Sequence, residues 1–165
     1  MAWTLSGAGL VAPASYSASG NVNTLDDYEE GKWVVVGSGT SGAITWHASY
    51  NEAKYIKIGG LVHNGGLLSS ASSTAAGNLS FSLPFQVGGG EGASSSHGIE
   101  PYRLNFTAGR QMIARVEGNV SVFSVVEMIS GTGGANPNGE PNIIDASDWT
   151  ATSTAMRWGF AYSAA

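Results

Sequence analysis

Cysteine is absent from the 165 residues of this chain, and charged residues make up only 12% of it. Without thiols, disulfides, thiolate chemistry and cysteine-based zinc sites are excluded. The seven lysines and arginines are scattered, and the net charge is −5. Because phosphate binding needs clustered basic side chains, we expect no nucleic-acid partner.

Long apolar runs are missing as well. No stretch approaches the ~20 residues that a membrane-spanning helix needs, so we expect no membrane partner. The first residues show neither the basic start nor the apolar stretch of a signal peptide. The sequence therefore predicts synthesis in a host cytoplasm, wherever the protein later resides. A small domain without disulfides must gain stability elsewhere, and oligomerisation is one usual route.

Glycine is abundant, with 24 residues, and serine, threonine and alanine replace the missing charge. Such a composition makes poor helices, because glycine costs about 1 kcal/mol in a helix interior. It suits turns and close approach of backbones. The length fits one domain.

Short apolar segments separated by glycine-rich turns predict an all-β fold of about eight strands, either an antiparallel β-sandwich or a jelly-roll-like barrel. We expect strands at 33–36, 44–47, 53–58, 61–68, 79–83, 102–106, 111–117, 120–129 and 156–162. The segment 33–36 is expected to be a buried strand, and Trp33 and Trp158 are expected in the core. Gly59-Gly60 predicts a hairpin turn, and Gly118-Asn119 predicts another.

Other segments predict loops. Asn64-Gly65-Gly66 suggests a bulge or second turn. Loops are expected at 69–78, 86–98 and 130–142. A short helix fits only at Ile143–Trp149, where Ser147 and Asp148 can cap a turn.

Residues 1–25 form a segment without a single charged side chain, which we separate from a single β-domain at 26–165. The aromatic and aliphatic residues of this segment are Trp3, Leu5, Leu10, Val11 and Tyr16. They suit an anchoring arm that lies against another apolar surface. The alternative is a solvated terminus rich in serine, alanine and glycine.

Catalytic, cofactor and metal sites are not expected. Asp26, Asp27, Glu29 and Glu30 could supply an acid and a base or hold Ca²⁺, but four acids on a turn are most often a solvated loop. The spacing of His47, His63 and His97 fits no metal motif, and His97 is expected in a loop. No nucleophile elbow and no phosphate-binding loop occurs. Hence the sequence predicts a non-enzymatic protein.

Two tryptophans stand beside polar turns. Trp46 and Trp149 are therefore the candidates for an exposed or intersubunit aromatic role. Exposed aromatic rings also stack on sugars, so a glycan partner stays open.

Four segments, in order, resemble the C-terminal domains of bacteriophage tail fibres. They are LDDYEEGKW (25–33), YIKIGGLV (55–62), NLSFSLPF (78–85) and SDWTATSTAMRWGFAYS (147–163). The resemblance implies a homotrimeric β-module on a virion surface.

The domain is expected to begin only 25 residues into the chain, without a fibre shaft before it. We therefore expect direct docking on the virion, as a protein that decorates or cements the capsid with the major capsid protein as partner. The alternative is a tail component, a receptor-binding tip that recognises host surface polysaccharide.

Overall fold

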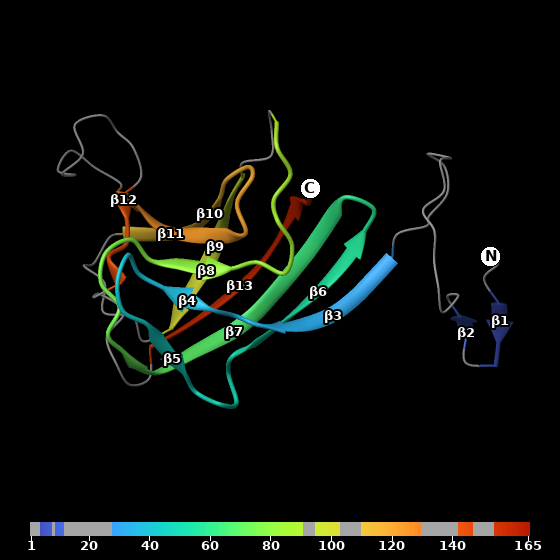
Figure 1. Cartoon of the computed structure of the whole chain (residues 1–165), viewed down its shortest axis with the longest axis horizontal. Helices are drawn as coiled ribbons and strands as arrows, with labels where there is room; N and C mark the ends of the chain where they lie inside the picture. Colours follow the sequence, from blue (N-terminus) through green and yellow to red (C-terminus); the bar gives the residue numbers. More distant parts are fainter. Residues whose placement is uncertain are drawn as a thin grey trace.

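The computed structural model describes residues 4–7, 9–11, 28–90, 95–102, 110–129, 142–146 and 154–165, and its elements are all β-strands (Figure 1). They are β1 (Thr4–Ser6), β2 (Gly9–Val11), β3 (Tyr28–Val34), β4 (Gly37–Ser38), β5 (Ile44–Trp46), β6 (Glu52–Ile58), β7 (Leu61–Ser73), β8 (Ser80–Ser82), β9 (Ser95–Tyr102), β10 (Arg110–Val116), β11 (Val122–Ile129), β12 (Asn142–Ile143) and β13 (Ala155–Ser163). Among these elements no helix is long and apolar enough to cross a membrane.

Eleven strands form one antiparallel sheet in the order β3-β6-β7-β13-β9-β10-β11-β8-β4, with β12 paired to β11 and β5 paired to β7. Figure 1 shows this sheet curling into a half-barrel, so that the half with β3, β6, β7 and β13 faces the half with β10, β11 and β8. The predicted all-β, antiparallel fold is therefore confirmed. β1 and β2 form a separate two-stranded sheet with each other.

The core lies between the two halves and is built on aromatic rings. The ring of Phe123 lies 5.3 Å from that of Phe81, 5.9 Å from that of Trp158 and 5.3 Å from that of Phe160, measured between centroids. All four side chains are buried. These rings join β8 and β11 to β13, so the core position predicted for Trp158 is confirmed.

Several predicted elements agree with the structure. The β6–β7 hairpin turns at Gly59-Gly60, where Gly59 has a φ of 56°. The β10–β11 hairpin turns at Gly118-Asn119, and Asn119 has a φ of 63°. Residues with short polar side chains or none tolerate this left-handed conformation, which is why the turn pairs could be read from the sequence.

The bulge or second turn predicted at Asn64-Gly65-Gly66 is wrong, because β7 runs without interruption from Leu61 to Ser73 and keeps an unbroken register with β6 and β13 through these residues. A β-carbon on Gly66 would lie 2.8 Å from the indole of Trp158 and 2.8 Å from the β-carbon of Ala53. Glycine at this position thus makes room for a core tryptophan. The loop expected at 69–78 is likewise strand as far as Ser73.

Other corrections concern the edges of the sheet. The segment 33–36 is buried only in part: Val35 is fully buried, but β3 ends at Val34, Val34 and Val36 are 57% and 63% exposed, and Trp33 is half-buried. The reason is that β3 is an edge strand with a single neighbour, β6. Glu29 and Glu30 lie within this strand rather than on a turn.

The remaining corrections fall on β9 and β12. β9 begins at Ser95, inside the predicted loop 86–98, and it places the half-buried ring of His97 4.8 Å from that of Phe160 in a stacked arrangement. Burial lowers the pKa of His97. Ile143 belongs to β12 rather than to a helix, and residues 147–149 of the predicted helix lie outside the described residues.

Candidate interaction surface

The outer face of β3, β6 and β7 carries a group of exposed apolar side chains. Strand alternation sends every second residue to this face. Tyr28 pairs with Ile58, and Ile58 pairs with Leu61, so the three residues form one row across three strands. Ile56 lies one row further along. These four residues, called the apolar end below, are between 42% and 53% exposed.

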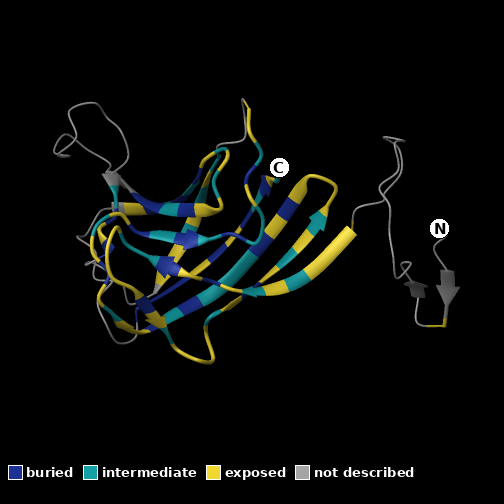
Figure 2. Ribbon diagram, in the orientation of Figure 1, coloured by how far each residue is buried: buried dark blue, intermediate teal, exposed yellow. Residues whose placement is uncertain are grey.

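Figure 2 shows exposed positions concentrated at the start of β3 and around the β6–β7 hairpin, where this apolar end lies. Single exposed apolar residues are normal on protein surfaces, whereas adjacent ones often mark an interaction site. Four large apolar side chains on neighbouring strands therefore make this face the first candidate surface.

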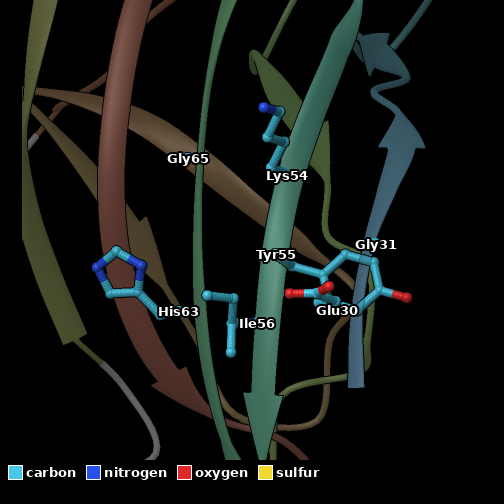
Figure 3. A pocket seen from close by; sticks show the side chains of 7 residues that line it. All are labelled: Glu30, Gly31, Lys54, Tyr55, Ile56, His63 and Gly65. Atoms are coloured by element: carbon cyan, nitrogen blue, oxygen red, sulfur yellow. The ribbon is translucent and has the colours of Figure 1, made fainter. Parts of the chain in front are cut away.

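A groove of about 580 Å³ adjoins the apolar end (Figure 3). Its lining residues are Glu30, Gly31, Lys54, Tyr55, Ile56, His63 and Gly65. The floor is low because Gly65 pairs with Gly159 on β13, and neither residue has a side chain to fill the space. The groove thus combines a carboxylate, an ammonium group and an imidazole above bare backbone, which suits hydrogen bonding to a polar ligand.

Beyond the groove the outer face is charged. Lys32 lies 3.0 Å from Glu52, and Arg157 lies 3.5 Å from Glu100, measured between nitrogen and oxygen atoms. All four side chains are more than half exposed, so each pair contributes only about 0–1 kcal/mol. These charges keep the middle of the sheet solvated, in contrast to the apolar end.

The opposite, inner face of β3 and β6 carries a half-buried aromatic group. The phenol of Tyr55 lies across Gly31 and donates a hydrogen bond of 2.5 Å to Glu29. This bond raises the pKa of Tyr55. The ring centroid of Tyr55 is 5.0 Å from that of Phe85, and both rings pack against the core.

Of the two tryptophans predicted to be exposed or intersubunit, the structure describes Trp46. Trp46 is half-buried on β5, and its ring lies 5.9 Å from that of Phe81, so part of the indole packs against the core. Its intersubunit role stays a prediction. Trp149 lies outside the described residues, as do Trp3 and Tyr16 of the arm.

The other arm residues lie in the separate hairpin. Leu5 on β1 pairs with Leu10 on β2, and Val11 ends β2. The docking of this arm on another surface is still a prediction.

The histidines lie apart from one another. His47 is exposed, with its ring 5.1 Å from that of Tyr50, while His63 lines the groove. Across the described ranges, no three histidine or acidic side chains come together as a metal site.

Sequence reasoning did not identify the apolar end. The alternation in residues 53–58 already placed Lys54, Ile56 and Ile58 on one face, with Ala53, Tyr55 and Lys57 on the other. Because Lys54 is expected to face solvent, the two isoleucines on the same face indicated apolar side chains on an exposed surface. The pairing with Tyr28 could not be read, because it depends on which strand lies beside β6.

Comparison with known proteins gives a structural likeness only. No protein-family model and no curated protein matches the chain. Among solved structures, the crystal structure of the Dettilon tailspike protein (gp208) is similar, with a TM-score of 0.57 and 18% sequence identity. The likeness covers 82% of this chain and 24% of the tailspike chain, so this chain corresponds to about a quarter of that protein's length. The chain thus shares its fold with one part of a tailspike.

Proposed function

We propose that this chain is a non-enzymatic structural module of a bacteriophage tail, which assembles as a homotrimer and contacts polysaccharide on the host surface. The observation that carries the proposal is the shared fold with part of a tailspike, over most of this chain. The order of sequence segments that resemble tail-fibre C-terminal domains supports the same conclusion independently.

Self-association is supported by the outer face. The apolar end exposes four large side chains on adjacent strands, and a contact with a second copy would remove them from water. Oligomerisation would also give a chain without disulfides additional stability.

Contact with polysaccharide is supported by the groove. Glu30 can accept hydrogen bonds from sugar hydroxyls, Lys54 can donate them, and His63 can do either.

The location on the virion is tested by counting copies. Quantitative mass spectrometry of purified virions should give a copy number comparable with that of tail fibre proteins, and gold-labelled antibodies should decorate the tail. A copy number comparable with that of the major capsid protein would overturn the tail assignment.

Receptor contact is tested with purified soluble protein. It should adsorb to host cells and compete with infection, and Glu30→Ala with His63→Ala should weaken both effects. Glu100→Ala is the matched control, since this acid lies on the same face but outside the groove. Absence of adsorption by the wild-type protein would remove the receptor-binding part of the proposal.

Capsid decoration is the second candidate. It is favoured by the uncharged segment 1–25, whose apolar residues suit docking on a shell. Deletion of residues 1–24 should then leave a soluble trimer that no longer binds capsids, whereas unchanged capsid binding would exclude this role for the arm.

A further inference from the structure

The apolar end lies where the chain enters the main sheet. Tyr28, the first residue of β3, belongs to the same row as Ile58 and Leu61. The segment that precedes β3 along the chain is therefore joined to it directly beside this uncovered surface.

That preceding segment has the composition of a partner for an apolar surface. Residues 1–25 contain no charged side chain, while Leu5, Leu10 and Val11 belong to the β1–β2 hairpin. An uncharged segment can pack on apolar side chains without the cost of removing a charge from water. Hence the arm and the apolar end match in chemistry.

The hairpin does not join the main sheet of its own chain. β1 and β2 pair only with each other, and Figure 1 shows them beyond the start of β3, clear of the outer faces of β6 and β7. Residues 12–27 connect the hairpin to β3 and can span up to ~50 Å when extended. A connection of that reach allows the hairpin to contact an adjacent subunit.

We propose that the arm of one subunit, residues 1–25, packs over the apolar end of a neighbouring subunit, so that the copies exchange arms. The occupant of the apolar end is thus a second copy of this chain. This inference rests on the self-association in the proposed function, and it names the segments that meet.

The absence of cysteine allows a direct test by cross-linking. One full-length chain carries Leu10→Cys and an affinity tag, and a second, untagged chain carries Ile58→Cys. The two are co-expressed, purified through the tag and treated with a short bis-maleimide. The control pair replaces Ile58→Cys with Val36→Cys, because Val36 is 63% exposed and lies outside the apolar end.

We expect tagged–untagged dimers from the Leu10→Cys and Ile58→Cys pair. They should form on the order of 1,000-fold faster than in the control pair, since docking holds the two thiols at an effective concentration on the order of millimolar, against micromolar for undocked thiols. Equal rates in the two pairs would overturn the proposal.

A third chain with both substitutions separates the two possible sources of the arm. If this chain cross-links only within itself and forms no cross-linked dimer, the arm covers its own subunit, and the proposed exchange is overturned. Light scattering on the same samples distinguishes the failures: a monomeric wild type removes self-association itself, whereas a trimer without the expected cross-link removes only the arm exchange.

Discussion

Along β7 and β13 the two faces of the sheet carry different kinds of side chain. The inner face presents Trp158 and Phe160, both almost fully buried, whereas the outer face of the same region presents Leu61, which is 53% exposed. On the inner face even a buried amide is satisfied: the Trp158 indole donates to Asn64 Oδ1 at 2.9 Å, and Asn64 Nδ2 donates to the Phe160 carbonyl at 3.1 Å.

The difference separates folding from assembly. Inner-face contacts determine whether one chain folds, because they hold the two halves of the sheet together. Outer-face apolar residues add little to a single chain and are available to a partner. If this division holds, substitutions on the inner face should destabilise the folded chain far more than substitutions on the outer face.

Phe123 and Val122 are neighbours on β11 with opposite exposure. Phe123 is fully buried among aromatic rings, and Phe123→Ala should lower the free energy of unfolding by about 3–5 kcal/mol. Val122 is 36% exposed, and Val122→Ala should cost less than about 1 kcal/mol. Urea unfolding followed by tryptophan fluorescence measures both, and equal losses would contradict the division.

Two glycines provide the same contrast without deleting any side chain. Gly66→Ala should cost about 2–3 kcal/mol, because its new methyl group would meet the Trp158 ring and the Ala53 methyl at 2.8 Å. At Gly159 the nearest atom to an added β-carbon is 4.0 Å away, so Gly159→Ala should change stability by less than about 0.5 kcal/mol. Thermal unfolding of the two variants side by side measures the difference, and a more stable Gly66→Ala protein would show that the inner face has spare room.

Asn64 tests whether the buried polar group matters as much as the rings. Asn64→Ala removes the acceptor of the Trp158 indole and should cost about 1–2 kcal/mol in urea unfolding. If the hydrogen bond is the cause, Asn64→Ala should lower the free energy of unfolding less in a chain that already carries Trp158→Phe than in the wild type, since no indole donor is then left unsatisfied. Strictly additive losses would point to packing alone.

Tyr162 makes inner-face stability dependent on pH. Burial raises the pKa of its phenol to about 12, although the backbone N–H of Phe85, which donates to the phenol oxygen at 3.2 Å, acts in the opposite direction. The folded state therefore favours the neutral phenol. Its contribution is complete below the unfolded pKa of about 10 and is lost as the pH rises towards 12.

Unfolding free energies measured at about pH 9 and about pH 11 should differ by on the order of 1 kcal/mol from this residue. In Tyr162→Phe that part of the pH dependence should vanish. An unchanged slope would mean that the phenol ionises as easily in the folded protein as in the unfolded chain.

The fold class followed from the sequence because its signals are local. Alternating residues such as those around Ile56 and the turn pair at Gly59-Gly60 act through near neighbours. By contrast, Gly65-Gly66 resembles a turn in the sequence. The reason for glycine at position 66, which is the space taken by the Trp158 indole, could not be recognised because Trp158 is remote in the sequence. Likewise, His97 follows a run of serines that resembled a loop, and its stacking on Phe160 depends on strand order.

The candidate surface was predictable only in part. Alternation places Ile56 and Ile58 on one face of the strand. Whether that face is buried depends on whether another layer of the protein covers it, and this is decided by the tertiary structure. Trp33 illustrates the same limit: its segment is apolar enough for a central strand, but its position at the sheet edge leaves the indole half-exposed.

The central claim is that the outer face serves assembly while the inner face serves folding. Light scattering combined with urea unfolding, on the wild type and on a chain carrying Ile58→Lys and Leu61→Lys, tests it most directly. The account predicts a wild-type trimer at micromolar concentration and a monomeric variant whose unfolding free energy, compared under conditions where both are monomeric, differs by less than about 1 kcal/mol. A monomeric wild type, or a variant that remains trimeric, would contradict it.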